Sequence, residues 1–169
     1  MDNKTKFNRW INLGSRSGKT LDEVCKALGK RPDTNYNSKN FSKEVIESQL
    51  RRLYSKEKTL ITLMGYLRIV PEDICREFTV MNIHPAPIHL KPYERYKGKD
   101  PIERYWKERP NSSNVVHLWG SVLHVATPEL DEGPIIANRI FGCRDLEECY
   151  NNSFSANIDL WVKYLKEVI

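Results

Sequence analysis

Residues 59–84, TLITLMGYLRIVPEDICREFTVMNIH, contain two apolar runs separated by a shorter polar segment. The runs at 59–64 and 78–83 lack the alternation of a half-exposed strand and are typical of strands buried on both faces. Pro71 opens the stretch at 71–76, which predicts a short helix because proline suits the first helical turn. A strand, a helix and a second strand in succession predict a parallel sheet, so this stretch favours an α/β fold.

The same alternation extends toward the amino terminus. Residues 9–13 form a short apolar run, and residues 21–28 carry apolar side chains at helical spacing. Thr20 and Glu23 match a capping box and predict that the helix begins there, while Gly29 predicts its end.

A loop and then an amphipathic helix are expected next. Residues 30–40 are polar and predict a loop. Residues 41–54 open with Ser42 and have apolar side chains at helical spacing, which predicts a crossover helix. Its apolar face consists of Val45, Ile46, Leu50 and Leu53.

The carboxyl-terminal half is expected to continue with a long loop, two strands and a helix. Residues 85–113 contain five prolines and predict an ordered loop, with helical structure at 101–106. Residues 115–126 and 135–141 are β-rich and flank a turn at 128–134. One face of the final helix is made of Ile158, Trp161, Leu165 and Val168.

The length and composition predict one compact domain. The chain has 169 residues, so we expect a single domain over residues 1–169: a minimal Rossmann-like α/β fold whose flanking helices cover a twisted, mostly parallel sheet. No apolar run approaches the roughly 20 residues of a membrane helix. The first residues lack the apolar core of a signal peptide, which favours a cytoplasmic protein. Four cysteines without paired spacing predict reduced thiols rather than disulfides or a metal site.

Positive charge is concentrated in the amino-terminal part of the chain. The net charge is +5, and the first 60 residues hold 14 Lys or Arg against 7 Asp or Glu. An excess of this kind predicts an anionic partner. This partner can be nucleic acid, a phosphorylated small molecule or a polyglutamylated cofactor, because all three are anionic. The charge of the chain alone does not distinguish between them.

Residues 14–20, GSRSGKT, come close to a phosphate-binding P-loop. Only three residues separate Gly14 from Gly18, one fewer than the motif requires, and the strand at 60–64 ends without a carboxylate to hold magnesium. A P-loop nucleotidase is therefore a minor alternative. Ser15, Ser17 and the amino end of the next helix can still bind a phosphate, and a plain strand-to-helix turn is an equal alternative.

Chemistry-bearing side chains lie at two places that the sheet can bring together. Asn82 and His84 end one predicted strand, at the edge where open α/β sheets bind ligands. His124 lies in the next predicted strand, and Asp131 follows in the turn at 128–134. An amide that binds a carbonyl oxygen, a histidine that carries a proton and an aspartate that sets its charge form an acyl-transfer apparatus. A packed histidine and an ordinary acidic turn are the alternative interpretations.

Five motifs occur in order between residues 65 and 136. They are Gly65-Tyr66-Leu67-Arg68-Ile69-Val70, Asn82-Ile83-His84-Pro85, Tyr96-Lys97-Gly98, Gly120-Ser121-Val122-Leu123-His124 and Glu129-Leu130-Asp131-Glu132-Gly133-Pro134-Ile135-Ile136. This series resembles the 10-formyltetrahydrofolate-dependent formyltransferases, with the strongest similarity to the glycinamide ribonucleotide formyltransferases. The resemblance implies a metal-free enzyme that moves a formyl group from 10-formyltetrahydrofolate to a primary amine on a small phosphorylated molecule, with glycinamide ribonucleotide as the first candidate.

The resemblance also implies roles for individual residues. The catalytic residues would be Asn82, His84 and Asp131, with His124 supporting Asp131. The folate would contact Leu67, Arg68, Ile69, Val70, Thr127, Glu129 and Leu130. The phosphate of the amine substrate would be held by Ser15, Ser17, Gly18 and Lys43.

Departures from the family pattern leave the acceptor open. His84-Pro85 is followed by Ala86-Pro87-Ile88 instead of Ser-Leu-Leu-Pro, and residues 97–104 are more similar to the members that formylate methionyl-tRNA or amino sugars. An amino sugar nucleotide or a modified nucleotide amine is therefore an alternative acceptor. Residues 91–109 interleave aromatic and basic side chains, so a non-catalytic nucleotide- or nucleic-acid-binding module is an alternative of another class. Four acidic residues in that segment disfavour binding to nucleic acid. Assembly of the chain into a homodimer is a further possibility.

Overall fold

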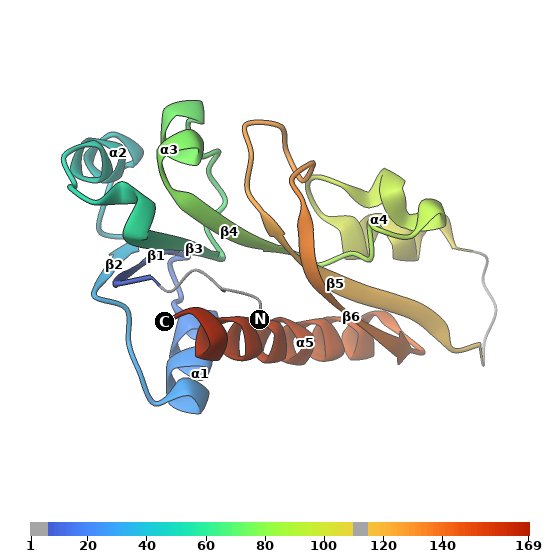
Figure 1. Ribbon diagram of the computed structural model, residues 1–169. Helices are drawn as coiled ribbons and strands as arrows, with labels where there is room; N and C mark the ends of the chain where they lie inside the picture. Colours follow the sequence, from blue (N-terminus) through green and yellow to red (C-terminus); the bar gives the residue numbers. More distant parts are fainter. Residues whose placement is uncertain (1–6, 110–114) are drawn as a thin grey trace, which may run out of the picture.

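The computed structural model describes residues 7–109 and 115–169 and contains a six-stranded sheet in the order β2-β1-β3-β4-β5-β6 (Figure 1). The strands are β1 (Arg9–Gly14), β2 (Thr34–Asn37), β3 (Thr59–Met64), β4 (Thr79–His84), β5 (His117–Val125) and β6 (Ile135–Cys143). The first four in this order pair in parallel, whereas β5 is antiparallel to both β4 and β6. The predicted mostly parallel, Rossmann-like sheet is confirmed.

Helices cover both faces of the sheet. They are α1 (Lys19–Leu28), α2 (Lys43–Arg51), α3 (Glu72–Glu77), α4 (Pro101–Glu108) and α5 (Leu146–Val168), with short 3-10 turns η1 (Lys56–Lys58) and η2 (Lys91–Tyr96). Helices α1 and α5 lie on one face, α2 and α3 on the other, and α4 lies beside β5 (Figure 1). None of the helices in the described part of the chain is both long and apolar enough to cross a bilayer.

Neighbouring residues of the central strands enter different cores. Leu60 packs with α1 and α5, whereas Ile61 packs with α2 and α3. Met81 and Val80 of β4 divide in the same way. Successive side chains of a strand point to opposite faces, so a strand covered on both sides needs an unbroken apolar run. Burying each such side chain contributes roughly 1.5–3 kcal/mol, which is why these runs fix the centre of the sheet.

Two predictions in the amino-terminal region are wrong. Helix α1 begins at Lys19 after Gly18, which adopts φ +65° and forms no side-chain cap, so Thr20 and Glu23 do not make the predicted capping box. Glycine accepts this left-handed conformation without steric cost, and the helix is therefore capped two residues earlier than predicted, at Gly18 instead of Thr20. Residues 30–40, predicted as loop, contain the edge strand β2. The predicted stop at Gly29 is confirmed.

The remaining elements agree with expectation more closely. Ser42 caps α2 by accepting a hydrogen bond from the backbone N–H of Val45, although Val45 itself is 45% exposed. The predicted loop at 85–113 contains η2 and α4, and its aromatic side chains pack against Trp119 of β5. Residues 110–113 of that loop lie outside the described residues.

Candidate active site

The register between β4 and β5 brings the first two predicted site residues together. Asn82 lies directly opposite His124 in the antiparallel pair. Opposite residues project from the same face of a sheet, so their side chains meet. The distance from the Asn82 amide nitrogen to His124 Nε2 is 3.4 Å.

A tight turn after β5 returns Asp131 to these residues. The backbone N–H of Val125 donates to the carbonyl of Pro134, which closes the turn at 2.9 Å. Gly133 allows this approach, because a Cβ there would lie 1.7 Å from the Val125 carbonyl oxygen. Asp131 adopts φ +56°, a left-handed conformation that aspartate tolerates better than most residues. Its side chain is therefore turned inward and is only 3% exposed.

Asp131 joins both histidines. One carboxylate oxygen, Oδ2, lies 3.1 Å from His84 Nδ1, and the other, Oδ1, lies 3.6 Å from His124 Nε2. Oδ2 also accepts a hydrogen bond from the backbone N–H of Gly98 at 2.8 Å. The four predicted residues, Asn82, His84, His124 and Asp131, thus converge at the carboxyl end of β4.

His84 is held between two hydrogen-bond acceptors. Its Nδ1 faces Asp131, and its Nε2 lies 2.8 Å from the carbonyl oxygen of Tyr96. Burial disfavours the charged ring and lowers the pKa of His84. The Asp131 carboxylate and the Tyr96 carbonyl act in the opposite direction, because two acceptors favour a ring that carries both protons. A buried imidazolium held in this way gives up a proton readily, which suits a proton relay.

His124 is arranged as a neutral ring. Its Nδ1 donates to the carbonyl of Val125 at 3.0 Å, and burial lowers the pKa of His124. With the proton on Nδ1, the Nε2 lone pair accepts from the Asn82 amide. This contact fixes which way the Asn82 side chain faces and leaves the second hydrogen of its NH₂ group for another acceptor.

The predicted folate segments flank this cluster at the same edge of the sheet. Residues 67–70 follow β3, and residues 127–130 lead into Asp131. Leu67 is 97% exposed, Ile69 66% and Leu130 60%, while Val70 is buried. Exposed apolar side chains beside a polar site are typical of a surface that receives a ligand. The assignment of the folate to these residues stays a prediction.

Two other predicted folate residues have structural contacts in this state. The Arg68 guanidinium donates to the backbone carbonyls of Ser38 and Phe41, each at 3.3 Å. The Thr127 hydroxyl donates to the carbonyl of Glu129 at 3.0 Å, which stabilises the approach to the Asp131 turn. These contacts position the two segments, and Glu129 is exposed to solvent.

The predicted phosphate residues lie where β1 meets α1. The Ser15 and Ser17 hydroxyls are 3.2 Å apart, and the backbone N–H of Gly18 donates to Ser15 Oγ at 3.3 Å. Lys43, at the start of α2, pairs with Glu47 at 3.6 Å. Lys19, which a P-loop would direct at a phosphate, lies 4.7 Å from the centroid of the Phe154 ring. Phosphate binding by this loop stays a prediction.

Two main-chain groups complete the site and were missed from the sequence. They are the carbonyl of Tyr96, which contacts His84, and the N–H of Gly98, which contacts Asp131. Both belong to the Tyr96-Lys97-Gly98 motif. Every residue has these backbone groups, so residue types alone do not reveal their roles.

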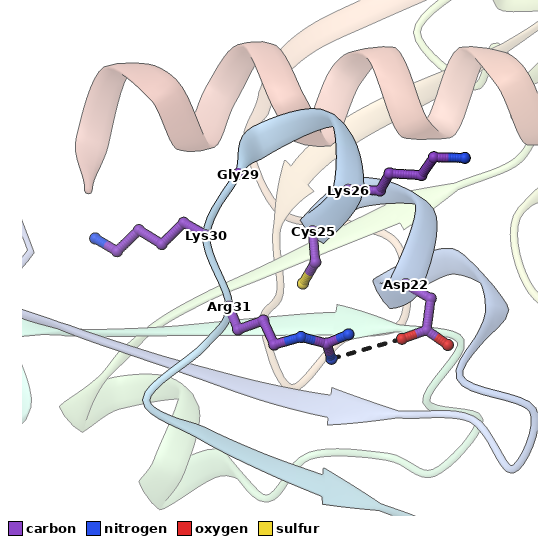
Figure 2. A pocket seen from close by; sticks show the side chains of 6 residues that line it. All are labelled: Asp22, Cys25, Lys26, Gly29, Lys30 and Arg31. Carbon is purple, nitrogen blue, oxygen red and sulfur yellow. Dashed lines mark ion pairs between the residues drawn. The ribbon is translucent and has the colours of Figure 1, made fainter.

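A separate hollow of about 260 Å³ lies beside the carboxyl end of α1 (Figure 2). It is lined by Asp22, Cys25, Lys26, Gly29, Lys30 and Arg31. Arg31 points across it toward Asp22, at 3.7 Å (Figure 2). Helices in such units run opposite to the strands, so the end of α1 is remote from the carboxyl end of β4.

Solved structures share this fold. Glycinamide ribonucleotide transformylase 1 from Geobacillus kaustophilus is 22% identical, with a TM-score of 0.68 over 94% of this chain and 97% of that chain. Phosphoribosylglycinamide formyltransferase from Campylobacter jejuni subsp. jejuni is 18% identical, with a TM-score of 0.69 over 96% and 98%. A formyltetrahydrofolate deformylase from Pseudomonas syringae pv. tomato is 18% identical, with a TM-score of 0.69 over 98% of this chain and 63% of that one.

A protein-family model matches most of this chain. The model described as formyl transferase matches residues 9–153, which include the whole sheet and all four converging side chains. The match extends over most of the sequence. The chain therefore belongs to the formyl transferase family of enzymes.

Proposed function

We propose that this protein transfers a formyl group from 10-formyltetrahydrofolate to a primary amine of a small phosphorylated molecule, with glycinamide ribonucleotide as the first candidate. The observation that carries the proposal is the convergence of Asn82, His84, His124 and Asp131 within hydrogen-bond or ion-pair distance. Packing alone requires no such set of buried polar groups, because each is costly to bury unless it is paired.

The chemistry follows from these positions. The amine nitrogen attacks the formyl carbon, the carbonyl oxygen gains negative charge, and the bond from carbon to the folate nitrogen N10 then breaks. The free hydrogen of the Asn82 amide donates to the developing oxyanion, and a protonated His84 adds positive charge nearby. The acceptor nitrogen must lose one proton and N10 must gain one. Asp131, directly or through a water molecule, and His84 relay that proton.

The ligand sites are proposed on the same edge. The pterin ring would lie against the exposed apolar side chains of Leu67 and Leu130, with peptide groups of 127–131 at its rim. The acceptor phosphate would lie at Ser15 and Ser17, beside the amino end of α1. The names of the Geobacillus and Campylobacter relatives support glycinamide ribonucleotide. An amino sugar nucleotide or a modified nucleotide amine is the alternative acceptor.

Hydrolysis is a second candidate reaction. The Pseudomonas relative is a formyltetrahydrofolate deformylase, and the buried pair of His84 and Asp131 could activate water in place of an amine. The products would then be formate and tetrahydrofolate. A non-catalytic nucleotide- or nucleic-acid-binding module of the same fold, and assembly into a homodimer, are the other hypotheses.

A substrate panel separates these proposals. Purified protein is mixed with 10-formyltetrahydrofolate and with glycinamide ribonucleotide, an amino sugar nucleotide, a nucleotide amine or buffer, and tetrahydrofolate is followed by absorbance. Tetrahydrofolate that forms only with an amine supports transfer, and formation in buffer with formate as co-product indicates hydrolysis. No tetrahydrofolate with any acceptor, and no effect of Asp131→Asn, would falsify the enzymatic proposal. Steeply salt-dependent binding to RNA or DNA would then favour the binding module.

A further inference from the structure

The side chain of Arg104 in α4 is bonded to the main chain beside the site. Its Nη1 donates to the carbonyl oxygens of Lys97 at 2.9 Å and Lys99 at 3.2 Å. Its Nη2 donates to the carbonyl oxygen of Arg95. Among residues 7–109 and 115–169, Arg104 forms no salt bridge, so its donors serve backbone carbonyls instead of a carboxylate.

The residues between these carbonyls are the ones that contact the catalytic pair. The carbonyl of Tyr96 lies 2.8 Å from His84 Nε2, and the N–H of Gly98 donates to Asp131 at 2.8 Å. The carbonyls of residues 95, 97 and 99 accept from Arg104, and the carbonyl of Tyr96 between them reaches His84. One guanidinium is thus hydrogen-bonded on both sides of each backbone contact to the site.

This segment needs such a restraint. Gly98 has φ +85°, in the region that favours glycine, and glycine loses more conformational freedom on ordering than other residues. The Tyr96 hydroxyl donates to Glu108, and Lys97 pairs with Glu132, but these contacts hold side chains. The carbonyls are held by Arg104, whose guanidinium also lies 5.6 Å from the centroid of the Tyr96 ring.

We propose that Arg104 is a positioning residue for formyl transfer: it holds the backbone of residues 95–99 so that Tyr96 and Gly98 orient His84 and Asp131. The inference rests on the proposed function, because it assigns Arg104 a role in that reaction. The hydrogen bonds of Arg104 go to the carbonyls of residues 95, 97 and 99, none of which belongs to the folate or acceptor site that we propose. Its loss should therefore lower kcat more than it changes KM, since a displacement of about 1 Å at reacting groups costs on the order of 100-fold in rate.

The pKa of His84 reports the charge of Arg104 and its positioning role separately. Burial lowers this pKa most, the Tyr96 carbonyl raises it, and the Arg104 charge lowers it further. Loss of the charge should therefore raise the pKa of His84, whereas loss of the oriented Tyr96 carbonyl should lower it. Lysine at this position keeps the charge but loses the planar fork that reaches three carbonyls, so Arg104→Lys isolates the orientation and should lower the pKa of His84.

The test compares Arg104→Met and Arg104→Lys with Arg109→Met as the matched control. Arg109 is another arginine at the end of α4, but it contacts the Trp106 ring at 3.7 Å and His117 at 2.9 Å, away from residues 95–99. We expect kcat to fall by roughly 10- to 100-fold in both Arg104 variants, with KM for 10-formyltetrahydrofolate changed by less than about threefold. The control should keep the kcat of the unmodified protein.

A readout independent of activity is the titration of His84, followed by ¹⁵N NMR of the imidazole in the substrate-free protein. A lowered pKa of His84 in Arg104→Lys, a higher pKa in Arg104→Met than in Arg104→Lys, and no change in Arg109→Met support the inference. An unchanged or raised pKa of His84 in folded Arg104→Lys, or an unchanged kcat in both folded Arg104 variants, would overturn it. If the unmodified protein transfers no formyl group but the pKa of His84 still falls in Arg104→Lys, the proposed function fails while the orientation of His84 by Arg104 stands. If Arg104→Met does not fold, the Arg104→Lys variant decides.

Discussion

Replacement of Asp131 with asparagine separates the chemical role of this residue from its structural role. Asparagine tolerates the left-handed φ of +56° at this position, and its carbonyl oxygen can still accept from the Gly98 N–H, where Asp131 now accepts at 2.8 Å. Its NH₂ group would face His124 Nε2, which now lies 3.6 Å from the other carboxylate oxygen and can accept a hydrogen bond. The free energy of unfolding of this variant should therefore lie within about 1 kcal/mol of that of the unmodified protein.

Alanine at the same position gives the contrast. It would leave the Gly98 N–H without its acceptor, which costs about 1–3 kcal/mol, and alanine lacks the short polar side chain that makes the left-handed region tolerable, for roughly 1–2 kcal/mol more. Asp131→Ala should thus lose about 2–5 kcal/mol of stability. Urea unfolding, followed by the fluorescence of the buried tryptophans, measures both variants.

The activity of Asp131→Asn should fall even though its fold is kept. Without the carboxylate, the proton relay loses one of its two groups, and a protonated His84 loses its charged partner at 3.1 Å. General acid–base catalysis contributes about 10²–10⁴-fold, so kcat/KM for formyl transfer should fall by about that factor. A folded Asp131→Asn protein that keeps its kcat/KM, or an asparagine that destabilises the protein as much as alanine does, would contradict these two roles of Asp131.

Four further substitutions test the Asp131 turn, His124 and the proposed phosphate site. Gly133→Ala should prevent correct folding or cost more than about 3 kcal/mol, because the new Cβ would lie 1.7 Å from the Val125 carbonyl, and a thermal melt equal to the unmodified protein would contradict this. Burial lowers the pKa of His124, so the unfolded chain binds more protons, and stability should fall as the pH drops below about 6.5. His124→Gln should reduce that slope by up to about 1.4 kcal/mol per pH unit in urea melts at pH 5–7, and an unchanged slope would count against a neutral buried ring. Ser17→Ala and Lys43→Met should raise KM for a phosphorylated acceptor several-fold but not KM for the folate, and equal effects on both would remove the phosphate assignment.

The buried strands and the polar site residues were the features that could be predicted from the sequence. Strand β3 occupies the predicted residues and β4 lies one residue later than predicted, because strands covered on both faces need apolar runs. Strand β2, TNYN, lies at the edge of the sheet with polar side chains, so its pairing with β1 supplies what its own sequence does not indicate. The start of α1 depends on the left-handed backbone of Gly18 rather than on the side chains of a capping box.

The convergence of the site could also be predicted, because strand ends meet at one edge of a parallel sheet. The hydrogen bonds between Arg104 and residues 95–99 could not be predicted, because their acceptors are backbone carbonyls that every residue type carries. It likewise left the direction of the His84 ring undefined, because one of its two partners is the Tyr96 carbonyl.

We propose that Asn82, His84, His124 and Asp131 form a site that moves a formyl group between nitrogens. NMR tests this by following the ¹³C-labelled formyl group of 10-formyltetrahydrofolate with glycinamide ribonucleotide present. The label should appear as a formamide on the acceptor, in step with tetrahydrofolate, and Asp131→Asn should slow this by orders of magnitude. Label that stays on the folate with every acceptor, or that moves equally fast in Asp131→Asn, would contradict the proposed role of these four residues.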